Sequence, residues 1–259
     1  MAASPSWDVG QYRKFEDERT RPALDLIGRI PAVEPQLIID LGCGSGQITD
    51  LLARRWPDAR VFGVDSSPAM LAAARRRESR VVWEEGDIAD WTPERPVGLL
   101  FSNAALQWLD GHTTLFPRLF DFLTPGGVLA VQMPLNQEAP SHRAMGEAAA
   151  AGSWADRLLP RVRHAPVADP AVYYDLLAPR ARFVDLWETT YLHVMPDLDA
   201  IIEWVKGTGL RPLLEALGDA AERDAFLADY RARLAGAYRP QPDGRVLFPF
   251  RRLFLLACR

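Results

Sequence analysis

Three closely spaced glycines follow a short apolar run in this 259-residue chain. Gly42, Gly44 and Gly46 lie within the stretch IIDLGCGSGQ, residues 38–47. A turn from a strand into a helix offers free backbone N–H groups at the positive end of the helix dipole, and glycine lets a ligand lie against the chain. Gln47 stands where the G-x-G-x-x-G fingerprint of a dinucleotide-binding loop requires its third glycine. The loop therefore predicts a ligand at the backbone and argues against a nicotinamide dinucleotide.

Three aspartates accompany this loop. Asp65 ends the second apolar run, where a carboxylate can accept both hydroxyl groups of a ribose. Asp87 ends the third run, where it can accept a hydrogen bond from the exocyclic amine of adenine while Ile88 covers the ring. Asp40 precedes the glycines and suits a ligand with a positive charge or an ammonium group better than one with a pyrophosphate. Together they predict an adenosine with a cationic tail.

The elements that position these residues form an alternating pattern. Short runs rich in Val, Ile, Leu and Phe predict strands at 36–42, 59–65, 80–87, 97–103 and 127–133. Segments of helix length lie between them, at 46–56, 66–77 and 113–123. This alternation is typical of an α/β fold with a doubly wound, mostly parallel sheet, which binds its ligands outside the carboxyl ends of the strands.

The second half of the chain does not continue the alternation of strands and helices. Residues 136–180 and 197–240 are expected to be helical cap segments, and 181–194 and 245–258 to be closing strands that pair antiparallel. Asp219 and Glu222 have the spacing of a capping box at a helix start. With 1–30 as N-terminal lid helices and 36–135 as the cofactor-binding core, the whole chain, 1–259, is expected to be a single domain.

Composition and charge restrict the classes of partner that we expect for this chain. The formal net charge of −4 and the sequence pI of about 5.6 provide no basic field for nucleic acid. No apolar run approaches the roughly 18 residues of a membrane helix, and the start of the chain lacks the order of a secretory signal. Cys43 and Cys258 lie at opposite ends of the chain and form no metal pattern. We therefore expect a soluble, cytoplasmic protein without a metal, a nucleic-acid partner or a membrane partner.

Five motifs in this order resemble those of class I S-adenosylmethionine-dependent methyltransferases: DLGCGSG, GVDSSPAM, GDIADW, SNAALQWL and LTPGGVLAVQ. The resemblance covers about 36–133. It implies a Rossmann-like class I methyltransferase fold, with a mostly parallel seven-stranded sheet, an antiparallel last strand and helical cap insertions. It also implies S-adenosylmethionine as the cofactor. The residues that it places at the cofactor are Asp40, Gly42, Cys43, Gly44, Gly46, Asp65, Ser66, Met70, Asp87, Ile88, Asn103, Gln107 and Trp108.

Four further stretches resemble, over almost the whole chain, those methyltransferases of this class that esterify trans-aconitate: YRKFEDERTRP, FSNAALQW, DLWETTYLH and FPFRRLF. The resemblance implies methyl transfer to a carboxylate of trans-aconitate or a similar small polycarboxylic acid, giving the monomethyl ester and S-adenosylhomocysteine. A carboxylate acceptor with a pKa near 4 is already ionised, so we expect no general base and no catalytic residue beyond those that position the reactants.

Arginine binds carboxylates best, because its planar fork donates two parallel hydrogen bonds. The candidate substrate-binding residues are Tyr12, Arg19, Arg211, Arg251 and Arg252. Arg251 and Arg252 are neighbours on a predicted strand, so at most one of them can face the acceptor.

Three alternatives stay open at the level of sequence. The same scaffold could act on a different acceptor, such as a carrier-bound malonyl group or another small acid. A protein that binds the cofactor without turning it over is a second possibility. A nicotinamide-dependent oxidoreductase is the third, and both Gln47 and the position of Asp40 argue against it. The state of assembly does not follow from the sequence.

Overall fold

The computed structural model of the protein describes residues 16–162 and 167–259. Within these ranges the chain forms two compact units. Unit 1 contains the described parts of Met1–Pro134, Pro166–Thr189 and Arg252–Arg259, and unit 2 contains those of Leu135–Ala165 and Thr190–Arg251. Among the helices described, none is long and apolar enough to cross a membrane.

The strands form one seven-stranded sheet in the order β3-β2-β1-β4-β5-β7-β6. Their bounds are β1 (Leu37–Leu41), β2 (Arg60–Asp65), β3 (Val82–Glu85), β4 (Val97–Asn103), β5 (Leu123–Pro134), β6 (Phe183–Met195) and β7 (Val246–Cys258). The pairs among β1 to β5 are parallel. The chain moves outward from β1 to β3 and then returns to place β4 on the other side of β1. At such a switch point the carboxyl ends of β1 and β4 leave a crevice for a ligand.

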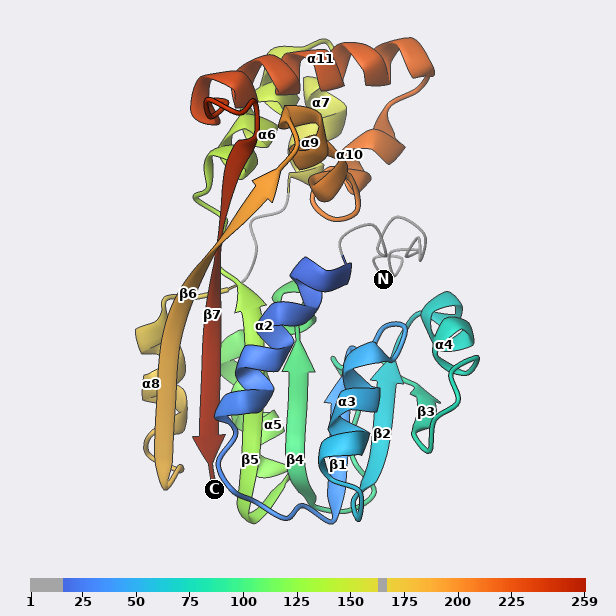
Figure 1. Cartoon of the computed structure of the whole chain (residues 1–259), viewed down its shortest axis with the longest axis vertical. Coiled ribbons are helices and arrows are strands. Elements are labelled where there is room, and N and C mark those ends of the chain that lie inside the picture. The colour runs from blue at the N-terminus through green and yellow to red at the C-terminus, as the bar shows by residue number, and fades with distance from the viewer. Residues whose placement is uncertain (1–15, 163–166) are drawn as a thin grey trace. The chain divides into compact units, whose positions relative to one another are not determined.

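Helices cover the sheet of unit 1 on both faces. They are α2 (Glu16–Arg29), α3 (Gln47–Arg55), α4 (Pro68–Ala74), α5 (His112–Asp121) and α8 (Pro170–Leu177), with the short 3₁₀ helix η1 (Leu106–Trp108). Figure 1 shows α2 and α3 in front of the strands and α5 behind them. Because both faces are covered, every residue of β1 is buried. The side chain of Ser67 caps α4 by accepting a hydrogen bond from the Met70 N–H, as its position before Pro68 predicts.

The last strand is antiparallel, as predicted. β7 pairs antiparallel with β5, in a register that runs from Val128 opposite Cys258 to Pro134 opposite Arg252. The N–H of Arg182 donates to the Cys258 carbonyl at 2.8 Å, which joins the start of β6 to the end of β7. The arrows of β6 and β7 run in opposite directions in Figure 1. The predicted pairing of the two closing strands is therefore confirmed, and β7 also closes the parallel part of the sheet.

The predicted strand bounds hold to within two residues except at the start of β5, which differs for a physical reason. β5 begins at Leu123 and not at residue 127. Leu123 pairs with Val97, and the register then shifts before Leu99 meets Val128. Proline and glycine are depleted in regular strands, so the intervening Pro125, Gly126 and Gly127 concealed this irregular start.

Unit 2 is mainly helical. Its elements are α6 (Pro140–Ala151), α7 (Ala155–Leu158), η2 (Leu159–Arg161), α9 (Leu198–Lys206), α10 (Arg211–Ala216) and α11 (Ala220–Ala237), together with the remaining parts of β6 and β7. The imidazole of His193 lies 4.7 Å from the ring of Trp204, and Phe248 and Phe250 lie around the same pair. This aromatic cluster joins the helices of unit 2 to its strand pair. α8 belongs to unit 1, where it packs on α5, so the segment 136–180 contributes to both units.

The expected capping box starts α11 with one change. Asp219 Oδ1 accepts a hydrogen bond from the Glu222 N–H at 2.8 Å. Glu222 Oε2 accepts from the N–H of Gly218, also at 2.8 Å, and not from that of Asp219. The glutamate thus binds the backbone one residue earlier than in a regular capping box.

Candidate functional site

The three glycines turn the chain from β1 into α3, and all three have positive φ angles, between 55° and 82°. A Cβ added at Gly42 would lie 2.2 Å from the Cβ of Ala105, and one added at Gly46 would lie 2.4 Å from the ring of Trp83. At Gly44 an added Cβ would meet nothing within 4 Å. Two of the glycines are therefore required by neighbouring protein atoms. Gly44 alone leaves open space where a ligand can approach the backbone.

Cys43 lies between these glycines and is buried. Burial raises the pKa of its thiol far above the ordinary value, and the negative charges of Asp40 and Asp65 raise it further. The thiol stays protonated at neutral pH, so Cys43 is no nucleophile.

Asp65 at the end of β2 is tied to the glycine loop. Its Oδ2 accepts a hydrogen bond from the Gly44 N–H, and its Oδ1 accepts one from the Ser67 N–H, both at 2.8 Å. A carboxylate has about four lone-pair positions, so each oxygen can accept one more hydrogen bond. Burial raises the pKa of this carboxyl group, although the two N–H donors oppose the shift. Ser66 beside it is exposed, and Met70 is buried in α4.

Asp40 on β1 is an unusual buried acid, with 2% of its surface exposed. Thr49 Oγ1, on α3, donates a hydrogen bond to its Oδ2 at 2.6 Å. Burial raises the pKa of Asp40 to about 7, and the charge of Asp65 adds to the effect. A cationic group placed nearby would favour the ionised form and lower this pKa again.

The loop after β3 carries Asp87 and Ile88. Asp87 Oδ1 accepts a hydrogen bond from the Ala89 N–H at 3.0 Å, which leaves its second oxygen for another donor. The Cδ1 atom of Ile88 lies 3.6 Å from the point where a Cβ on Gly42 would stand. Arg118 on α5 holds this loop, since its Nη2 donates to the Ile88 carbonyl at 2.6 Å. The predicted adenine-side residues and the glycine loop are therefore neighbours.

The loop after β4 lies at the same carboxyl end of the parallel strands as the glycine loop. Asn103 ends the strand, and Ala104 follows with φ at +53°, a left-handed conformation that is rare for a residue with a side chain. Gln107 Nε2 donates to the Ala104 carbonyl at 2.7 Å and stabilises the turn. Asn103 Oδ1 and Gln107 Oε1 are buried and have no hydrogen-bond partner within the described residues. Unsatisfied buried acceptors at the carboxyl end of a parallel strand indicate a ligand position. Trp108 is half-buried in the same loop.

His112 supports this loop and does not act as a base there. Its Nε2 lies 2.9 Å from the Leu106 carbonyl and its Nδ1 lies 2.6 Å from Tyr173 Oη. Nε2 must carry the proton to donate to a carbonyl, so Nδ1 accepts from the tyrosine hydroxyl. Burial lowers the pKa of His112, which keeps the ring neutral. In the described parts of the chain, no group of three His, Cys, Asp or Glu side chains could hold a metal ion.

The candidate anion-binding residues are spread over both units. Arg252 belongs to unit 1, is 3% exposed, and donates from Nη1 to Gln132 Oε1 at 3.1 Å. Arg211 starts α10 in unit 2, with its Nε 3.5 Å from Glu215 Oε1. The backbone of Arg19 lies in α2, while its side chain and Tyr12 lie outside the described residues.

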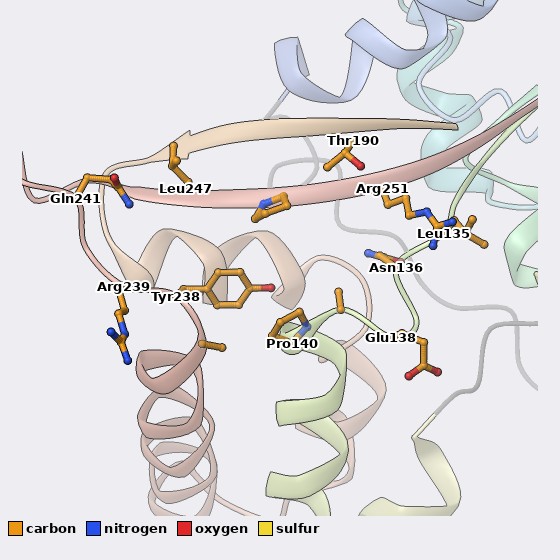
Figure 2. Close-up of a pocket in the computed structure, with 13 residues that line it drawn as sticks. Leu135, Asn136, Glu138, Pro140, Thr190, Tyr238, Arg239, Gln241, Leu247 and Arg251 are labelled. Atoms are coloured by element: carbon orange, nitrogen blue, oxygen red, sulfur yellow. The ribbon is translucent and has the colours of Figure 1, made fainter. Parts of the chain in front are cut away.

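Arg251 lines a pocket of unit 2 with a volume of about 600 Å³. Figure 2 shows its side chain beside Asn136 at one end of this pocket, with Arg239 at the other. The remaining lining residues are Leu135, Glu138, Ala139, Pro140, Thr190, Ala237, Tyr238, Gln241, Leu247 and Pro249. Arg251 and Arg252 thus have separate surroundings, as their alternation on β7 requires.

Comparisons with known proteins identify the family of the chain. A family model described as a methyltransferase domain matches residues 38–127. The chain is 54% identical to the trans-aconitate 2-methyltransferase of Azoarcus sp. (strain BH72), over 98% of this chain and 100% of that protein. It is 52% identical to the trans-aconitate 2-methyltransferase of Methylobacterium radiotolerans, over 97% of both chains.

Solved structures share the fold. The phosphoethanolamine N-methyltransferase 2 of Haemonchus contortus, in complex with S-adenosyl-L-methionine, matches with a TM-score of 0.54 at 19% identity. That match covers 92% of this chain and 52% of the other. A plantazolicin methyltransferase in complex with a pentazolic desmethylPZN analogue and S-adenosylhomocysteine matches with a TM-score of 0.51 at 16% identity, over 96% of this chain and 88% of the other.

Proposed function

The chain belongs to the trans-aconitate 2-methyltransferase family, and on that premise we propose that it transfers a methyl group from S-adenosylmethionine to a carboxylate of trans-aconitate. The products are the monomethyl ester and S-adenosylhomocysteine. The observation that carries the proposal is identity of 48% to 54% with relatives of this name over nearly the whole chain. A carrier-bound malonyl group or another small acid as acceptor is not favoured by these relatives.

The features around the glycine loop fit this cofactor. Gly44 leaves space at the backbone, and each oxygen of Asp65 can accept one ribose hydroxyl. In this proposal Ile88, which lies beside Gly42, covers the adenine ring, and the second oxygen of Asp87 accepts from the adenine amine. The residues that we assign to the cofactor are Asp40, Gly42, Cys43, Gly44, Gly46, Asp65, Ser66, Met70, Asp87, Ile88, Asn103, Gln107 and Trp108. When bound, S-adenosylmethionine supplies a methyl group that its sulfonium has already activated.

The charge properties of Asp40 support its assignment to the methionine portion of S-adenosylmethionine. With a pKa of about 7, Asp40 is a poor partner for an anion and gains most from a cation. The unsatisfied Asn103 Oδ1 and Gln107 Oε1 can accept hydrogen bonds from an ammonium group. None of these side chains has to move a proton during the transfer.

The residues that hold the acceptor act by orientation. An ionised carboxylate needs no base, and holding it in line with the methyl group supplies most of the rate enhancement. Among the candidates whose side chains the structure describes, Arg252 lies in the same unit as the glycine loop, whereas Arg211 and Arg251 lie in unit 2. Burial among protein atoms restricts its guanidinium, which favours one orientation of a bound carboxylate. Tyr12, Arg19, Arg211 and Arg251 stay predictions, as do the single-domain organisation and the cytoplasmic location.

The test uses purified protein with S-adenosylmethionine labelled on the methyl group. We expect a base-labile, labelled ester with trans-aconitate and none without an acceptor. Parallel reactions with cis-aconitate, isocitrate and a malonyl-loaded acyl carrier protein define the acceptor. Ester formation on the carrier protein with none on trans-aconitate would contradict the proposal. Cofactor binding without transfer to any acceptor would show a binding protein.

A further inference from the structure

Gln132, the last residue of the LTPGGVLAVQ motif, is a fully buried polar residue on β5 to which the motif assigns no role. It lies near the carboxyl end of this strand, where parallel sheets bind their ligands. Its Oε1 accepts the hydrogen bond from Arg252 Nη1. Its Nε2 is buried and has no hydrogen-bond partner within the described residues. One half of this amide therefore holds the arginine, and the other half is a donor without an acceptor.

Strand register places three polar side chains on one face of the sheet. Asn103 on β4 is paired with Gln132 in the parallel ladder. Pro134, two residues after Gln132, is paired with Arg252 in the antiparallel ladder. Paired residues point to the same face, and so do residues two apart on one strand. Asn103, Gln132 and Arg252 therefore form a row across β4, β5 and β7.

The chemistry of this row suits an anion at one end and a cation at the other. Arg252 and the Nε2 of Gln132 are donors, and Arg252 is charged. The unpartnered atom of Asn103 is an acceptor oxygen. Leaving a buried donor unsatisfied is costly, so a donor without a protein partner requires an explanation, and a bound ligand supplies one. A carboxylate meets the donors, because it accepts two hydrogen bonds in one plane.

We propose that Gln132 is an acceptor-binding residue, which orients Arg252 through Oε1 and donates from Nε2 to a carboxylate of the acceptor. The inference rests on the proposed function, since it assigns a polycarboxylate to this row. Gln132 and Arg252 together clamp a carboxylate group that is not the one being methylated. Gln132 thereby selects for acceptors with at least two carboxylates.

Gln132→Glu is the decisive substitution. The variant keeps an oxygen for Arg252 Nη1 but replaces the donor with a second carboxylate oxygen, which repels the acceptor. We expect KM for trans-aconitate to rise about 10- to 100-fold, the range for losing a hydrogen bond to a charged group. We expect kcat and the Kd for S-adenosylhomocysteine to stay within about twofold, which is under half a kcal/mol. Gln132→Met, which lacks both polar atoms, should also raise KM.

Gln36→Glu is the matched control. This glutamine is exposed, and it precedes β1 at the amino ends of the parallel strands. The substitution makes the same chemical change as Gln132→Glu. The KM of the Gln36→Glu variant for trans-aconitate should equal that of the unaltered protein. If Gln132→Glu kept the original KM, or lost cofactor affinity and kcat to the same degree as acceptor affinity, Gln132 would be only a structural residue.

A binding measurement separates this inference from the proposed function. Protein saturated with S-adenosylhomocysteine is titrated by calorimetry with trans-aconitate, citrate, succinate and acetate. Weakened binding of the di- and tricarboxylates to Gln132→Glu, with acetate unaffected, supports the inference. If the unaltered protein binds citrate or succinate but not trans-aconitate, the proposed substrate fails and Gln132 is still tested with the acid that binds. If it binds no polycarboxylate, both are contradicted.

Discussion

The Nη1 of Arg252 donates a hydrogen bond to the Oε1 of Gln132 at 3.1 Å, and both side chains are buried in unit 1. A neutral amide orients a guanidinium without neutralising its positive charge. Arg251, its neighbour in the chain, is exposed and lines a pocket in unit 2. The two adjacent arginines should therefore differ in their contribution to acceptor binding.

Arg252→Met should raise KM for trans-aconitate about 10- to 100-fold, because a hydrogen bond to a charged group is lost. Arg251→Met is the matched variant, and its KM should change by less than about threefold, as for a solvated surface charge. Steady-state kinetics of both variants, with S-adenosylhomocysteine affinity as the control for folding, measure the difference. A larger rise in KM for Arg251→Met than for Arg252→Met would indicate that the acceptor binds in the unit 2 pocket instead.

Gly44→Ala should mainly weaken cofactor binding, and Gly46→Ala should mainly lower stability. At Gly44 only the left-handed backbone is strained, at a cost of about 1–2 kcal/mol, but the added methyl group enters the ligand space and should abolish most cofactor binding. At Gly46 the methyl group meets the Trp83 ring, so we expect a larger loss of stability. Urea unfolding and calorimetry separate the two effects. Trp83→Leu should partly rescue Gly46→Ala and leave Gly44→Ala unchanged.

Asp40→Asn should stabilise the protein without cofactor, and increasingly so as the pH rises. Burial raises the carboxyl pKa to about 7 in the folded chain from an ordinary value of 3.8. Between these values the folded state binds the proton and the unfolded state does not, so stability falls as pH rises to about 7. Asparagine lacks this penalty, and the gain should grow by about 2–4 kcal/mol from pH 5 to pH 8. Urea unfolding at both pH values measures it, with the exposed Asp58→Asn as the control. An equal gain at both pH values would contradict a raised pKa.

The same carboxyl group should make cofactor binding depend on pH. A cation beside Asp40 binds best when the group is ionised, so the affinity for S-adenosylhomocysteine should rise from pH 5.5 to about 8. In Asp40→Asn this rise should disappear and the affinity should be low throughout. Calorimetry in buffers of different ionisation enthalpy should also detect a proton released on binding near pH 6.5. If no proton were released, Asp40 would not lie beside the cationic part of the ligand.

Ala104 offers a test of backbone strain beside the site. Its φ of +53° costs an alanine about 1–2 kcal/mol, which Ala104→Gly should partly recover. Ala104→Val should destabilise the protein by more than the alanine strain, because a β-branched residue tolerates this conformation poorly. Thermal unfolding ranks the three proteins. A valine variant as stable as the glycine variant would contradict the left-handed turn.

The sequence by itself determined the scaffold and predicted the glycine-loop end of the candidate site. Strand and helix periodicity is local, and so is the turn from β1 through the glycines into α3, so both can be read from contiguous residues. Asp65 and Asp87 end consecutive parallel strands, and the carboxyl ends of such strands share one edge of the sheet. Their proximity to Gly44 and Gly42 therefore followed from topology alone.

Tertiary structure decided what depends on residues distant in the chain. Only packing shows that Gly46 is required by Trp83 and Gly42 by Ala105, leaving Gly44 for a ligand. The raised pKa of Asp40 comes from burial, which no motif encodes. Gln132 ends one of the sequence motifs, but its contact with Arg252, 120 residues away in the chain, exists only in the folded structure. Contacts across a sheet and the electrostatics of its interior arise when distant segments meet, so single-chain patterns do not contain them.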